Sequence, residues 1–236
     1  MKSSVWSEDE LSNVKNVDRI LPSQKIHSKM YKGKDFYGDL EKTLFSMYPQ
    51  REFQIETKPG MSYAVMGSEI NTLKFYQFLI RSHGYKKVLE LGTYIGVSAM
   101  YMAEAGAHVT TIECGTEFWR IAQTNLRLNR LLSKVDCKHY DAIKYMKDTT
   151  TKFDLILIDC AKQSYHELLE LSLSRLNAGG MILIDDVFFQ GDTLNSTPKS
   201  EKGIGVRKAL DFAASLTEWD KVIVPIGNGL LLMRQG

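Results

Sequence analysis

Three carboxylates and one lysine stand where two apolar segments of the chain end. Asp159 follows Leu155-Ile-Leu-Ile158, and Asp185 and Asp186 follow Met181-Ile-Leu-Ile184. If these segments are neighbouring parallel strands, about 4.8 Å apart, their ends bring the three side chains together. Carboxylates at close range repel one another, so they either stay protonated or bind a cation. Oxygen ligands favour a hard ion, so the pattern predicts a Mg²⁺ site, with Ca²⁺ or Mn²⁺ as alternatives, although aspartates also cap loops at such positions.

Lys162 lies three residues beyond Asp159 and therefore beside this predicted cation site. A neighbouring cation and partial burial both lower the pKa of a lysine, which would let Lys162 act as a general base. Taken alone, a lysine at this position is more simply interpreted as a solvated side chain.

A second group of residues surrounds two glycines after an earlier apolar segment, in Val88-Leu-Glu-Leu-Gly-Thr-Tyr-Ile-Gly-Val-Ser98. Gly92 and Gly96 let the backbone approach a ligand closely, and the helix that follows offers unpaired N–H groups. Glu113 ends the next apolar segment, where a carboxylate can accept both hydroxyls of a ribose. The pattern predicts a cofactor that contains a nucleoside.

The same loop argues against a dinucleotide. It lacks the middle glycine of Gly-x-Gly-x-x-Gly, and Tyr94 takes up room in the turn. The chain also has no Walker-type Gly-Lys-Ser/Thr. Glu90 brings a negative charge to the mouth of the loop, which suits a cationic amino-acid group better than a phosphate.

Apolar and amphipathic segments alternate from residue 86 onward. Strands are predicted at 87–91, 109–113, 136–140, 153–159, 180–185, 221–225 and 230–234, and helices at 68–82, 98–105, 117–129, 142–147, 165–173 and 205–216. Continuously apolar strands require a sheet covered on both faces, and the alternation predicts an α/β fold with a doubly wound, mostly parallel, seven-stranded Rossmann-like sheet. Asn228-Gly229 is a hairpin signal, so the last strand should run antiparallel to its neighbour.

Two further segments have their own predictions. Residues 1–60 are expected to form an N-terminal extension of helices and loops, with a helix at 39–48, that packs on the core or on a dimer partner. The loop at 192–203 follows a strand's carboxyl end, where α/β active sites lie, and is expected to cover a substrate.

Bulk properties fit one soluble α/β domain. The chain has 236 residues, 44% of them hydrophobic and 25% charged, with a net charge of +2 that neither demands nor excludes nucleic acid. Its three cysteines are widely spaced and form no metal-ligand pattern, which favours a reducing cytoplasm. We expect no signal peptide and no membrane span.

Taken together, these motifs resemble the cation-dependent O-methyltransferases, which include the catechol and caffeoyl-CoA enzymes and their bacterial relatives. The resemblance rests on Asp159-x-x-Lys162-x-x-Tyr165, on Gly179-Gly-Met-Ile-Leu-Ile-Asp185-Asp186, on the glycine loop and on Pro225-Ile-Gly-Asn-Gly-Leu230. It runs from about Met61 to the C-terminus and implies a class I methyltransferase domain at 61–236 that binds S-adenosylmethionine (SAM).

The resemblance also implies roles for individual residues. Lys162 corresponds to the catalytic base, and the divalent metal is bound by Asp159, Asp185 and Asp186. The residues implied to surround SAM are Val65, Glu90, Gly92, Tyr94, Ser98, Glu113, Asp141, Ala142 and Asp159. One departure concerns the metal site, because the family usually has Asp-Asn where this chain has Asp185-Asp186.

The expected reaction is methyl transfer from SAM to one hydroxyl of a catechol-like, small aromatic acceptor, by a cytoplasmic enzyme that forms a homodimer. Two alternatives stay open. A tRNA methyltransferase acting on a hydroxylated wobble uridine would use the lysines between residues 25 and 34 as an RNA-binding arm. A SAM-binding module without catalysis would leave the aspartates idle.

Overall fold

The structure, a computed structural model, describes residues 43, 46–47, 53–57 and 67–236. Val65, the lysines between 25 and 34 and most of the predicted extension lie outside these residues. Within the predicted helix at 39–48, residues 43, 46 and 47 are helical.

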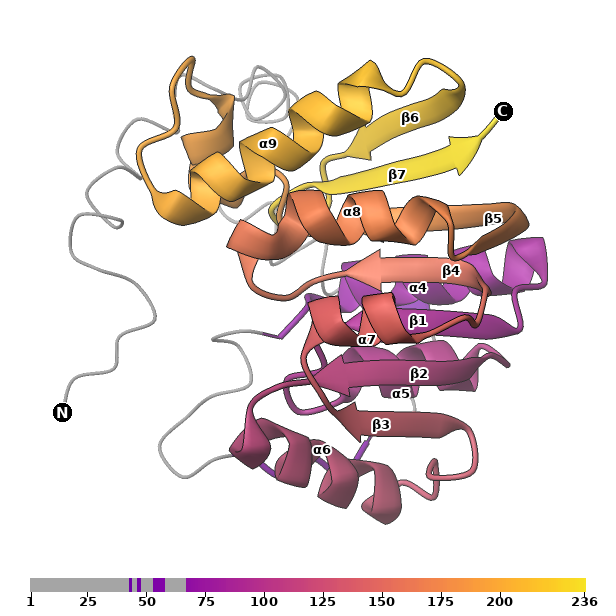
Figure 1. Ribbon diagram of the computed structural model, residues 1–236. Helices are drawn as coiled ribbons and strands as arrows, with labels where there is room; N and C mark the ends of the chain where they lie inside the picture. Colours follow the sequence, from indigo (N-terminus) through magenta and orange to yellow (C-terminus); the bar gives the residue numbers. More distant parts are fainter. Residues whose placement is uncertain (1–42, 44–45, 48–52, 58–66) are drawn as a thin grey trace, which may run out of the picture.

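A single twisted sheet forms the centre of the described part (Figure 1). Its strand order is β3-β2-β1-β4-β5-β7-β6. All neighbours pair in parallel except β7, which runs antiparallel to both β5 and β6. The prediction of a doubly wound, mostly parallel sheet of seven strands with a terminal antiparallel hairpin is therefore confirmed. The strands are β1 Lys87–Leu91, β2 His108–Glu113, β3 Val135–His139, β4 Phe153–Ile158, β5 Leu176–Ile184, β6 Trp219–Val224 and β7 Leu230–Gln235.

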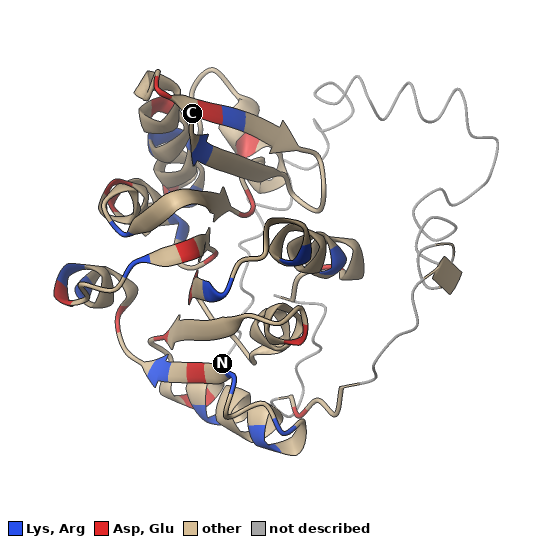
Figure 2. Ribbon diagram, turned by 90° about the vertical axis from the view of Figure 1, so that its right-hand side faces the viewer, with Lys and Arg blue, Asp and Glu red and all other residues tan. Residues whose placement is uncertain are grey.

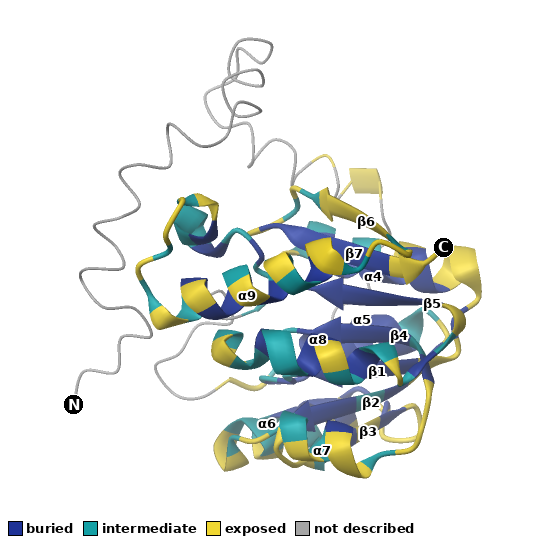
Figure 3. Cartoon of the chain, turned by 45° about the horizontal axis from the view of Figure 1, so that its top comes forward, coloured by how far each residue is buried: buried dark blue, intermediate teal, exposed yellow. Residues whose placement is uncertain are grey.

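Helices cover both faces of the sheet, which is why its central strands are buried along most of their length (Figure 3). On one face pack α4 (Ile70–His83), α5 (Val97–Glu104) and α6 (Thr116–Leu128). On the other face pack α7 (Ala142–Asp148), α8 (Tyr165–Leu173) and α9 (Glu201–Ser215). None of the helices in the described part of the chain is long and apolar enough to cross a bilayer.

Two elements begin four residues earlier than predicted. Helix α9 begins at Glu201 rather than at residue 205, because the Ser200 side chain accepts a hydrogen bond from Gly203 N and caps the first turn. The segment before it is partly a 3₁₀ helix, η4 (Phe189–Leu194), so the predicted loop at 192–203 is only partly irregular. Strand β5 begins at Leu176, which pairs with Phe153 before an irregularity in the register with β4.

The functional residues lie where the strand order reverses, between β1 and β4. Strand β1 lies between β2 and β4, and α5 after β1 covers the opposite face from α8 after β4. Loops that leave neighbouring strands toward opposite faces open a crevice at the carboxyl edge of a parallel sheet.

Candidate active site

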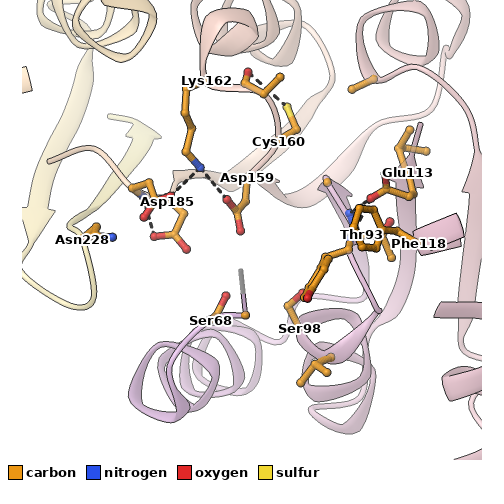
Figure 4. Close-up of a pocket in the computed structure, with 18 of the residues that line it drawn as sticks. Ser68, Thr93, Ser98, Glu113, Phe118, Asp159, Cys160, Lys162, Asp185 and Asn228 are labelled. Atoms are coloured by element: carbon orange, nitrogen blue, oxygen red, sulfur yellow. Dashed lines mark hydrogen bonds and ion pairs between the residues drawn. The ribbon is translucent and has the colours of Figure 1, made fainter. Parts of the chain in front are cut away.

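A cavity of about 550 Å³ opens at this carboxyl edge. The loops that follow β1, β2, β4 and β5 all contribute to its wall. Figure 4 shows Asp159, Lys162 and Asp185 on one side of the cavity and Glu113, Thr93 and Phe118 on the other. The sheet thus brings residues from both groups that the sequence indicated, the carboxylates with the lysine and the glycine loop with Glu113, to the wall of one cavity.

The glycine loop contains three backbone positions with positive φ. Gly92 has φ 106°, and a Cβ at this position would collide with the backbone oxygen of Asp159. Gly96 has φ 87° and precedes the first residue of α5. Tyr94 between them has φ 51°, and its ring packs against Phe118 with ring centroids 5.0 Å apart. Glycine at 92 therefore lets the loop after β1 pass directly beside the backbone of the loop after β4.

Glu113 fixes this loop through its side chain. Its Oε2 accepts hydrogen bonds from Thr93 N (3.3 Å) and Tyr94 N (2.9 Å), and its Oε1 accepts one from Gly115 N (2.7 Å). Glu113 also lines the cavity. The carboxylate at the end of β2 is therefore already oriented at the cavity wall.

Glu90 lies one layer behind the cavity wall. It is almost fully buried on β1 and is not one of the residues lining the cavity, whereas Ser98 is. Ser98 Oγ donates a short hydrogen bond to Glu90 Oε1, and Thr111 Oγ1 donates one to Oε2 at 2.5 Å. Burial raises the pKa of Glu90, the two hydroxyl donors lower it in part, and the resulting pKa is about 8.

The acidic end of the cavity contains the predicted carboxylates. Lys162 Nζ forms ion pairs with Asp159 Oδ1 (3.1 Å) and with Asp186 Oδ2 (2.8 Å), and its side chain is only 11% exposed. Asp186 has φ 59°, a left-handed conformation that Asn and Asp tolerate better than other side chains. As the side chains stand, the described residues include no group of three or more His, Cys, Asp and Glu arranged to hold a metal ion.

Charge and burial act in opposite directions on Lys162. Burial lowers the pKa of its ammonium group, but the neighbouring Tyr165, Asp159 and Asp186 outweigh it, and the pKa lies well above its ordinary value. In this state Lys162 holds a proton. The carboxylates that raise its pKa are those predicted to bind a cation, so its proton affinity depends on what they bind.

Asp185 is the most buried of the three carboxylates. Its Oδ2 accepts a hydrogen bond from Tyr76 Oη on α4 (3.1 Å), and its Oδ1 accepts one from Asp186 N (2.7 Å). Burial raises the pKa of Asp185 to about 8, and the charges of Asp159 and Asp186 add to the effect. The charges of Asp159 and Asp186 are therefore close enough to disfavour the ionisation of Asp185.

The other predicted residues are placed as follows. Ala142 lines the cavity, whereas Asp141 is not among its lining residues and caps α7 by accepting a hydrogen bond from Lys144 N (2.9 Å). Val65 lies outside the described residues. Sequence reasoning did not identify Thr93, Thr111 or Tyr76, whose polar contacts support the predicted residues.

Comparison with known proteins places the chain among methyl-transferring enzymes. A sequence model of the family described as "O-methyltransferase" matches residues 48–236. "Probable caffeoyl-CoA O-methyltransferase 1" of Dictyostelium discoideum is 25% identical over 195 residues, which cover 78% of this chain and 84% of that protein. The catechol O-methyltransferase of Niastella koreensis is 32% identical over 142 residues, or 56% of this chain and 64% of that protein.

The fold is also that of solved methyltransferases. The O-methyltransferase TomG from Streptomyces achromogenes, solved in complex with SAM, superposes with a TM-score of 0.71 at 18% identity. The superposition covers 84% of this chain and 96% of TomG.

Proposed function

This chain belongs to the O-methyltransferase family, and we propose that it transfers the methyl group of SAM to one hydroxyl of a catechol-like acceptor with the help of a divalent metal ion. The observation that carries the proposal is the convergence of two sites in one cavity. A glycine loop with an oriented acidic strand end borders one side, and three carboxylates with a lysine border the other.

The cofactor side suits an adenosyl group joined to a cationic amino acid. Glu113 at the end of β2 is the residue proposed to accept the ribose hydroxyls, and the glycine loop allows close approach of the ligand. Ser98 presents a hydroxyl at the wall where we place the amino-acid part, with the Glu90 carboxylate behind it. Ala142 would border the adenine.

The acidic side suits a hard divalent cation. The donors are carboxylate oxygens, and the raised pKa of Asp185 reflects its burial and, after that, repulsion from Asp159 and Asp186 that a cation would relieve. Asp159, Asp185 and Asp186 would hold the metal. When bound, it would supply a Lewis acid that lowers the pKa of an acceptor hydroxyl.

The remaining contribution of the chain is positioning. Phe189 lines the cavity near the carboxylates and offers an apolar surface to an aromatic ring. Lys162 Nζ sits where it could hold or take the hydroxyl proton, between two of the carboxylates. Holding the acceptor oxygen in line with the methyl group accounts for most of the expected rate gain.

The test is the formation of S-adenosylhomocysteine (SAH) from SAM and a simple catechol, first with Mg²⁺ and then with excess EDTA. We expect turnover that EDTA abolishes and added Mg²⁺ restores. Asp185→Asn should lower turnover at least about a hundredfold, whereas Asp211→Asn, at an exposed position on α9, should leave it unchanged. Turnover that is indifferent to EDTA would refute the metal site.

The alternatives remain predictions. The lysines proposed as an RNA-binding arm lie outside the described residues, and basic and acidic residues are interspersed over the described elements (Figure 2). If SAH binds but catechol is not methylated, a hydroxylated RNA base becomes the next acceptor to test. If neither metal nor acceptor affects the bound cofactor, the non-catalytic binding module becomes the better interpretation.

A further inference from the structure

A row of side chains crosses the sheet beneath the cofactor side of the cavity. The pairing of β3, β2, β1 and β4 places Cys137, Thr111, Glu90 and Leu157 side by side on neighbouring strands. Cys137 and Leu157 belong to the apolar core on this face. Thr111 and Glu90 are thus a polar pair enclosed by apolar neighbours, and Thr111 has no exposed surface.

The free protein keeps the Glu90 proton up to about pH 8, and a cationic group bound beside Ser98 would favour the loss of that proton. In the ionised state the hydrogen bonds of this pair have only one consistent direction. A carboxylate can only accept, so both Ser98 and Thr111 donate to it. Thr111 has then used its single proton, and the hydrogen bond between Thr111 Oγ1 and Thr93 Oγ1 (2.6 Å) must be donated by Thr93. The result is an ordered chain of donors, from Thr93 to Thr111 to Glu90.

The direction of this chain determines what Ser98 offers to a ligand. Because the Ser98 proton points back to Glu90, the lone pairs of Ser98 Oγ are left for the cavity that Ser98 lines. An acceptor at this point matches an ammonium group, which has only protons to donate. A protonated Glu90 could instead donate to Ser98 and turn the hydroxyl proton toward the ligand.

We propose that Thr111 is a positioning residue for the cofactor: its hydrogen bond holds the Glu90 carboxylate so that Ser98 faces the cavity as an acceptor for the amino group of SAM. The inference rests on the proposed function, because it assumes that SAM occupies this side of the cavity. Thr111 itself does not line the cavity and acts only through Glu90 and Ser98.

Thr111→Val removes the hydroxyl and keeps the shape of the side chain. Thr111→Ser keeps the hydroxyl, and Thr110→Val is a matched control on the same strand at a partly buried position. Each variant is titrated by calorimetry with two ligands, SAH and 5′-methylthioadenosine. The second ligand keeps the adenosine and the sulfur but lacks the amino-acid group, so it reports on the rest of the site.

We expect Thr111→Val to weaken SAH binding about tenfold at pH 7, the usual effect of losing one hydrogen bond to a charged group. Binding of 5′-methylthioadenosine should be unchanged, and Thr111→Ser and Thr110→Val should bind both ligands as the wild-type protein does. The loss should shrink as pH rises and Glu90 ionises even without its donor.

Two results would overturn the inference. Unchanged SAH binding in Thr111→Val would show that the hydroxyl is not needed, and an equal loss for both ligands would show general damage to the site. A second measurement needs no ligand: the Glu90 side-chain carboxyl, followed by ¹³C NMR, should titrate at higher pH in Thr111→Val than in the wild-type protein. If the wild-type protein fails to bind SAH at all, the proposed function itself is refuted, whatever the NMR titration shows.

Discussion

Replacing Glu90 by glutamine should stabilise the protein at neutral pH and weaken its cofactor site at the same time. Glu90 is 1% exposed, and burial raises its pKa from an ordinary value of 4.5 to about 8. The unfolded chain therefore loses this proton near pH 4.5, whereas the folded protein keeps it up to about pH 8. Between these values the folded state binds more protons, so the free energy of unfolding of the wild-type protein falls as pH rises.

The size of the effect follows from the interval between the two pKa values. Each pH unit within the interval lowers the free energy of unfolding of the wild-type protein by about 1.36 kcal/mol. At pH 7 the carboxyl therefore lowers it by about 3 kcal/mol, whereas an amide, which does not ionise, leaves it unchanged. For a chain of this length, that corresponds to a rise in melting temperature of roughly 6 to 12 °C for Glu90→Gln. The advantage should vanish below pH 4.5 and level off above about pH 8.

Urea unfolding of both proteins, followed by circular dichroism at several pH values from 4.5 to 9, measures this difference directly. Glu170→Gln, at an exposed position on α8, serves as the control and should follow the wild-type curve. A difference that does not change with pH would refute the reasoning, as would a wild-type protein that is the more stable one at pH 8. The same variant should bind SAH more weakly, because the carboxyl at this position lowers the stability of the protein but strengthens cofactor binding.

Three other substitutions test the remaining contacts. Tyr76→Phe removes the hydrogen bond to Asp185 and should weaken Mg²⁺ binding about tenfold by calorimetry while SAH binding stays the same. Gly92→Ala forces a Cβ into the backbone of Asp159 at φ 106° and should lower the free energy of unfolding by about 3 kcal/mol or more in urea. Glu113→Gln replaces a carboxylate that accepts three backbone hydrogen bonds and should weaken SAH binding about tenfold in the same calorimetric assay.

Matched controls separate these effects from general damage. Tyr85→Phe removes a hydroxyl bonded to Gly179 O, away from the cavity, and should leave Mg²⁺ binding unchanged. Gly106 has φ 103°, close to that of Gly92, but open space around it, so Gly106→Ala measures the backbone strain without the collision. Equal losses for the two glycine variants would contradict the close approach at Gly92.

The sequence predicted the elements whose signal is local. Apolar strands, the Asn228-Gly229 turn and the residues directly after β1, β2, β4 and β5 are all predictable from the sequence, because each depends on neighbours in the chain. The early start of α9 also had a local signal, since Ser200 is three residues before Gly203, whose N–H it caps.

Residues that act at a distance in sequence were missed. The hydrogen bond between Tyr76 and Asp185 joins positions 109 residues apart, and no pattern within α4 indicates it. Thr111 was part of a predicted strand, but its partnership with Glu90 requires the register of β1 against β2. A strand pattern gives the face on which a side chain lies, whereas the register that decides its cross-strand neighbour is set by the fold.

The position of Glu90 in the sheet itself argues for a ligand. On the other face of the sheet, the neighbouring row is apolar on β1, β4, β5 and β7, in Leu89, Ile156, Ile182 and Met233. An apolar residue at 90 would pack beside Leu157 and Leu183 in the core on its own face and avoid the desolvation that raises the pKa of the carboxyl. The chain instead places a carboxyl there with two hydroxyl donors, one of which lines the cavity. A buried acid that costs stability and is hydrogen-bonded to a hydroxyl at the cavity wall is accounted for by a cationic group on the other side of that hydroxyl, because such a group favours ionisation of the acid.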